Sequence, residues 1–306
     1  MDGWRSSVKS GCLFGFPLHQ FLWQSAKGFC VGQARHDHHK LYRVMGHSRI
    51  GTLPATKSWN GVVSLVANGA DEAAVADAVL VAAGKTFARV RADAGFREAM
   101  RLLMQLALAG SRPNPAAELA AAGLTISENT SLVDVVMAIS GEFDQRVDAA
   151  NGRSDFAEVA QRALVGSVTD LLKENLPSLF EPSRDDVSAA FKKLKQPWNF
   201  GKFFQNFVGG LTNGLLDTYL TRTLGTHLGE GQRFTTTDQM GQFNQAMKTH
   251  CKESSEIVKV FASEWFSKQR WLGAGEISRE KAEGFGWVAF RKMTLELAAR
   301  ARKYGN

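Results

Sequence analysis

The loop from Gly225 to Arg233 holds the residues best placed for binding chemistry. Its sequence, GTHLGEGQR, combines three glycines with one arginine, and three threonines follow before the next helical pattern. Glycine-rich main chain beside a helix start can direct several N–H groups at one anion. The candidate anion-binding residues are Gly229, Gly231, Arg233 and Thr237.

Two interpretations of this loop stay open. In the first, His227 and Glu230 add acid or base groups, and the loop is the centre of an enzyme or nucleotide-binding module. In the second, the loop only joins two helices, and Thr235 and Asp238 form a capping box. The spacing favours the second, because glycines and threonines at such positions are common in plain connections.

The adjacent residues His250 and Cys251 predict no nucleophilic pair. Neighbouring side chains on a helix point about 100° apart, so the two do not face each other. His250 also falls on an apolar stripe, which favours a buried structural histidine. We identify no catalytic residue in the sequence.

Basic and aromatic residues alternate in two stretches of the C-terminal third. Aromatic rings that stack on bases, next to cations that meet phosphates, are typical of single-stranded nucleic-acid binding. The same mixture arises when Lys and Arg stems cover core aromatics, and it also suits a helix on a membrane surface. The candidate surface residues are Lys192, Lys193, Lys195, Trp198, Lys202, Lys268, Arg270 and Trp271.

Residues 1–45 follow no helical or strand period, and we expect an irregular or disordered extension there. The run His36-Asp37-His38-His39 could share a metal ion, but built sites usually add a distant ligand pair. A translation start at Met45 explains the irregular composition better. We therefore expect neither a metal nor a cofactor.

Charge is distributed unevenly along the 306 residues, whose formal net charge is +7. Residues 46–189 hold 13 basic and 18 acidic side chains, whereas residues 190–306 hold 18 and 10. The basic end suits an anionic partner, or the acidic middle of the same chain. Three cysteines and the lack of a long apolar run favour a cytoplasmic protein without a membrane span.

After Met45 the apolar residues recur at helical spacing, and no alternating strand pattern appears. We predict an all-α bundle of about nine or ten helices. The stretch from Trp198 to Leu228 is rich in phenylalanine and glycine. Beyond Thr237, the clearest predicted helix buries Phe243, Met247, His250, Ser254, Ile257, Phe261 and Trp265, and a final helix is expected from about Ser278 to Tyr304. A boundary near Pro177 and Pro182 separates a helical domain at 46–180 from a basic helical domain at 181–306. The two could equally form one continuous core.

These patterns favour a non-enzymatic binding protein of bacterial style, acting as an adaptor or as a subunit of a larger assembly with a protein partner. The main support is that helical surface is plentiful while catalytic and metal-ligand spacings are missing. Nucleic-acid binding through the basic C-terminal third is one alternative. An enzyme or nucleotide-binding module at Gly225–Arg233 is the other.

Overall fold

The computed structural model describes residues 56–125, 131–177, 182–271 and 277–304. Within these ranges the chain is helical and contains no strand, which confirms the all-α class. The described residues form eleven α-helices of seven residues or more and the single-turn α3, so nine or ten was too few. The irregular extension expected at 1–45, with His36 to His39, lies outside the described residues.

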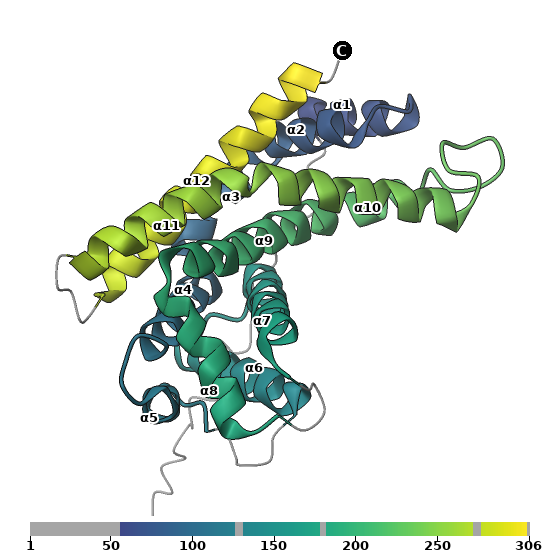
Figure 1. The fold of residues 1–306 in the computed structure, drawn as a ribbon. Coiled ribbons are helices and arrows are strands. Elements are labelled where there is room, and N and C mark those ends of the chain that lie inside the picture. Colours follow the sequence, from purple (N-terminus) through teal and green to yellow (C-terminus); the bar gives the residue numbers. More distant parts are fainter. Residues whose placement is uncertain (1–55, 126–130, 178–181, 272–276, 305–306) are drawn as a thin grey trace, which may run out of the picture. The chain divides into compact units, whose positions relative to one another are not determined.

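The helices follow one another with short connections, and Figure 1 labels most of them. Their bounds are α1 Lys57–Ala67, α2 Glu72–Ala82, α3 Gly84–Phe87, α4 Ala94–Ala109, α5 Pro115–Ala121, α6 Leu132–Ala149, α7 Asp155–Asn175, α8 Arg184–Lys192, α9 Pro197–Gly225, α10 Thr237–Ser254, α11 Glu256–Trp271 and α12 Arg279–Tyr304. Two 3-10 turns, η1 Val90–Ala92 and η2 Lys193–Lys195, complete the described secondary structure.

Most helices begin where a short polar side chain can accept a hydrogen bond from a free main-chain N–H. The Ser131 hydroxyl accepts from the Asp134 N–H at 3.2 Å, and the Asp134 carboxylate accepts from the Ser131 N–H at 2.8 Å. Ser183 and Asp186 form the same capping box at α8. Each box satisfies two N–H groups that the helix itself leaves unpaired.

Helix α9 is the longest helix and the centre of the core. It contacts α7, α10, α11 and α12, and Figure 1 shows it between α7 and the α10–α11 pair. Glycines let its neighbours approach closely: a Cβ at Gly201 would lie 2.5 Å from the main-chain oxygen of Lys259 on α11, and one at Gly214 would lie 2.7 Å from the Val159 side chain on α7.

The helix expected to run unbroken from Phe243 to Trp265 is two helices that meet at Ser255. The Ser255 hydroxyl donates to the Lys252 carbonyl at 2.6 Å, and serine hydroxyls that bond back to helix carbonyls commonly bend helices. The buried stripe shifts at this break. Before it, the expected residues Phe243, Met247, His250 and Ser254 are buried; after it, Val258, Ala262 and Phe266 replace the expected Ile257, Phe261 and Trp265.

One hydrophobic cluster draws buried residues from α1 through α12. Its contacts include α7 with α9, which crosses the boundary expected at 180–181. The division into helical domains at 46–180 and 181–306 stays a prediction. None of the described helices is long and apolar enough to span a membrane.

Candidate functional site: a polar groove along helix α9

A groove follows one face of α9, with α7 on one side and α10–α11 on the other. It consists of three adjoining depressions of about 80, 960 and 280 Å³. The first shares Lys202 and Asn206 with the central one, and the third shares Asn213 and Lys248 with it. Lining residues on α9 run from Trp198 to Leu220, which corresponds to about 33 Å of helix.

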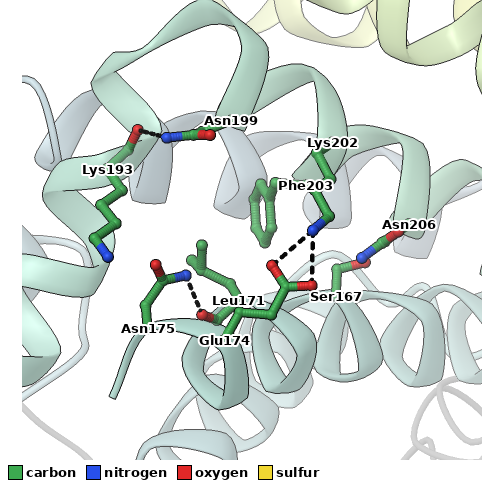
Figure 2. Close-up of a pocket in the computed structure, with 9 residues that line it drawn as sticks. All are labelled: Ser167, Leu171, Glu174, Asn175, Lys193, Asn199, Lys202, Phe203 and Asn206. Atoms are coloured by element: carbon green, nitrogen blue, oxygen red, sulfur yellow. Dashed lines mark hydrogen bonds and ion pairs between the residues drawn. The ribbon is translucent and has the colours of Figure 1, made fainter. Parts of the chain in front are cut away.

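Three asparagines of α9 line this groove at intervals of seven residues: Asn199, Asn206 and Asn213. Seven residues turn a helix almost two full turns, so the three carboxamides lie on one face. Asn199 donates to the Lys193 carbonyl at 3.0 Å, and Asn206 donates to Asp170 on α7 at 3.1 Å. Figure 2 shows Asn199 and Asn206 on either side of Lys202.

Further carboxamides line the groove. Asn175, at the end of α7, donates to the Leu171 carbonyl at 2.6 Å, and Gln205 donates to Glu256 on α11 at 2.9 Å. Asn244 and Gln245 of α10 line the third depression and are exposed. Because a carboxamide both donates and accepts hydrogen bonds, this lining suits a ligand that offers both kinds of group.

Ion pairs occupy part of the groove. The Lys202 ammonium on α9 lies 2.8 Å from each carboxylate oxygen of Glu174 on α7, so the pair links floor and wall (Figure 2). Hydrogen bonds from Lys259 and Gln205 lower the pKa of Glu256, which keeps this carboxylate ionised. The Lys259 ammonium also lies 4.6 Å from the ring centroid of Trp198.

Other cations of the groove have no such partner. The side chains of Arg162 on α7 and of Lys248 and Lys252 on α10 form no ion pair or hydrogen bond with any residue that the structure describes. The acidic side chains Asp170 and Asp217, by contrast, accept hydrogen bonds from Asn206 and Thr221. Six basic and four acidic side chains line the groove in all, so its net charge is positive.

The predicted anion-binding loop is folded around its own main chain. The Gly229 N–H donates to the Phe234 carbonyl at 2.9 Å, and the Phe234 N–H donates to the His227 carbonyl at 3.0 Å. Gly229 and Gly231 have φ values of +134° and +72°, which favour glycine. The glycines thus serve the turn, whatever else they bind.

Arg233 points away from this turn to the end of α1. Its guanidinium donates to the carbonyls of Val66 at 3.0 Å and Ala70 at 2.5 Å, and it lies 4.6 Å from the ring centroid of Phe243. Burial lowers the pKa of Arg233. Anion binding stays a prediction here, and this geometry lends it no support.

The start of α10 lies one residue later than the capping box that we expected at Thr235 and Asp238. Thr236 is the N-cap and accepts from the Gln239 N–H at 3.3 Å, so Thr237 is the first helical residue. The Gln239 side chain accepts from the Thr235 N–H at 2.8 Å. A glutamine side chain therefore reaches back to the main chain before the helix, where we expected an aspartate to do so.

The structure brings some of the candidate basic and aromatic residues together. The Arg270 guanidinium donates to the Lys195 carbonyl at 2.5 Å, which joins the end of α11 to η2. Lys193, Trp198 and Lys202 line the groove, whereas Lys192 is exposed on α8. Lys268 and Trp271 line a separate shallow depression with Glu264, and Trp271 is 84% exposed.

His250 and Cys251 are both buried, at 9% and 1% exposure. Burial lowers the pKa of His250 and raises that of the Cys251 thiol to about 12, which leaves the thiol protonated and unreactive. No three His, Cys, Asp or Glu side chains among the described residues could share a metal ion.

Sequence reasoning missed the three groove asparagines. The available signal was their seven-residue spacing within a stretch that we singled out only for its phenylalanines and glycines. That spacing places them on one helical face, but it does not reveal that α7 and α10 stand on either side of that face. Comparison of the chain with protein-family models, with curated proteins and with solved structures found no match.

Proposed function

We propose that this protein is a non-enzymatic binding protein that holds a polypeptide segment of a partner protein in the α9 groove. It would act as an adaptor or as a subunit of a larger bacterial assembly. The observation that carries the proposal is the groove itself, about 33 Å long and lined by carboxamides from α7, α9 and α10.

A polypeptide suits this lining better than a nucleic acid does. Each residue of a peptide offers one N–H donor and one carbonyl acceptor, which match the paired donors and acceptors of Asn and Gln side chains. The phosphates of a nucleic acid only accept hydrogen bonds, so they would leave the carbonyl oxygens of these carboxamides unused.

Nucleic-acid binding through the basic C-terminal third is the second candidate, and two observations favour it. Trp198 and Trp271 are exposed at 57% and 84%, and Lys195 lies beside Arg270. Such a surface predicts affinity for single-stranded nucleic acid that falls steeply with salt. We also propose a cytoplasmic location and a function without metal or cofactor.

Gly166 offers a direct test of the groove. It lies on α7 in the central depression, and a Cβ built there meets no atom within 4 Å. Gly166→Trp should therefore fill the groove without disturbing the core. Gly61→Trp is the matched control, because Gly61 is an exposed helical glycine on α1 with equally open space around it.

The parent protein and both variants would be panned against a displayed library of random 12-residue peptides. The proposal predicts that the parent and Gly61→Trp enrich peptides that Gly166→Trp fails to bind. Peptides that bind all three proteins equally, or no enrichment by the parent, would refute groove binding. Salt-sensitive binding of a thymidine 12-mer that survives Gly166→Trp would favour the nucleic-acid alternative instead.

A further inference from the structure

We infer that the bound segment is extended and acidic, and that its main chain hydrogen-bonds to Asn199, Asn206 and Asn213 at every third residue. This inference rests on the proposed function and names the ligand class for the same groove. Three independent features carry it: the spacing of the asparagines, the hydrogen-bonding atoms they leave free, and the unpaired cations beside them.

The spacing of the asparagines matches an extended chain. Seven helical residues rise by about 10.5 Å along the axis of α9. Three residues of an extended chain cover about 10 Å. A straight segment that lies along α9 therefore brings every third of its peptide groups level with the next asparagine, from Asn199 through Asn206 to Asn213.

Each asparagine keeps hydrogen-bonding capacity for a ligand. Asn199 and Asn206 each donate one N–H within the protein, which leaves a carbonyl oxygen and a second N–H on each. The Asn213 carboxamide forms no hydrogen bond with the described part of the chain. A helical ligand could not use these groups through its main chain, because its own N–H and carbonyl groups are already paired.

The charges select an acidic segment. Lys248 and Lys252 are one turn apart on α10, with Cβ atoms about 6 Å from each other. Both side chains are exposed and neither lies within ion-pair distance of a described carboxylate, although Glu256 attracts Lys252. Arg162, on the opposite wall formed by α7, also has no ion pair to a described residue. Carboxylates on the ligand would compensate these charges, whereas lysines on the ligand would not.

Reaching Asn199 requires the segment to pass the Lys202–Glu174 pair. Both side chains of this pair are about half exposed, at 48% and 49%, so the interaction is weak and a ligand can displace it. The acidic side chains of the ligand can then meet Lys202 as well.

The first experiment determines how the segment is held. A 12-residue peptide enriched by the parent protein is resynthesised with a single N-methyl group at each position in turn, and binding is measured by fluorescence anisotropy. Loss of one hydrogen bond predicts about fivefold weaker binding wherever the methylated N–H donates to an asparagine, and these positions should be a multiple of three residues apart. Equal losses at all positions, or losses confined to side-chain substitutions, would overturn the extended main-chain geometry.

The second experiment uses protein variants against the same peptide. Asn213→Ala should weaken binding about fivefold, while Asn60→Ala, at an exposed asparagine of α1, should leave it unchanged. The double variant Lys248→Glu, Lys252→Glu should weaken an acidic peptide at least tenfold, whereas Lys57→Glu, at an exposed lysine of α1, should not.

The outcomes separate this inference from the proposed function. Enrichment of neutral or basic peptides that Gly166→Trp abolishes would overturn the acidic ligand and leave the groove function standing. Binding unaffected by Asn213→Ala would overturn the asparagine contacts in the same way. Failure of the library to yield any groove-dependent peptide would refute both this inference and the proposed function.

Discussion

Replacing Arg233 by alanine should destabilise the fold in the complete absence of an anion. The side chain ties the loop before α10 to the end of α1, some 160 residues earlier, through hydrogen bonds to the Val66 and Ala70 carbonyls. Both accept from a charged donor, and carbonyls at a helix C-terminus attract cations further. The guanidinium also stacks on Phe234 and Phe243.

The magnitude follows from these contacts. A hydrogen bond from a charged group contributes about 1.5–3 kcal/mol, and the lower value applies here because Arg233 is half-buried. Two such bonds and a cation–π contact of about 0.5–1 kcal/mol are offset in part by the cost of burying the charge. We expect Arg233→Ala to lower the free energy of unfolding by about 2–4 kcal/mol.

Urea denaturation followed by far-ultraviolet circular dichroism measures this change as a lower midpoint at an unchanged slope. Arg222→Ala is the matched control: Arg222 is exposed on α9, and its loss should change stability by less than about 0.5 kcal/mol. Equal stability of the Arg233→Ala and Arg222→Ala variants would refute the structural role. Phosphate-dependent stabilisation of the parent that disappears in Arg233→Ala would instead support the anion site.

Three further predictions concern packing and titration. Gly201→Ala should cost about 1–3 kcal/mol in urea denaturation, because the new methyl group would lie 2.5 Å from a main-chain oxygen of α11. Gly210→Ala on the same helix makes only ordinary contact at 3.5 Å and should be neutral or stabilising. The thermal midpoint should fall as pH drops below about 6.5. Burial lowers the pKa of His250 in the folded state, so the unfolded chain binds the proton first and is stabilised by it. His250→Gln should flatten this dependence. With Cys12 and Cys30 replaced by serine, Cys251 should react with a thiol reagent only after denaturation, because burial raises its pKa to about 12.

Features that depend on a few neighbouring residues could be predicted from the sequence. The capping boxes at Ser131 and Ser183 are such features, because each needs only a serine and an aspartate three residues later. The sequence signal of the final helix, expected from Ser278 to Tyr304, is also local, and this helix is α12 in the structure. Local hydrogen bonds decide where such helices begin, and tertiary packing only stabilises them.

The break between α10 and α11 could not be predicted in this way. Both helices carry apolar residues at helical spacing, so the pattern alone continues through Ser255. At the break, the Ser255 hydroxyl bonds to the Lys252 carbonyl, and Ser255 packs closely against Gly209 of α9. The second of these contacts spans 46 residues of sequence.

The candidate sites differ for a related reason. The Gly225–Arg233 loop suggested an anion site because its composition is local information, whereas the partners of Arg233 lie on α1. The groove needs the relative placement of α7, α9 and α10, which no single segment encodes. Only the repeat of asparagines along α9 was visible beforehand.

The Lys202–Glu174 ion pair has a consequence for ligand length. It stands between Asn199 and the other two asparagines, so the stretch of α9 from Lys202 to Asp217 offers room for only about seven extended residues. A longer ligand must open the pair, at a cost of no more than about 1 kcal/mol. Affinity should therefore rise with peptide length up to about seven residues, and rise again only when a longer peptide gains enough contacts beyond the ion pair to offset the cost of opening it. Added salt weakens the pair, so the second rise should then begin at a shorter peptide length.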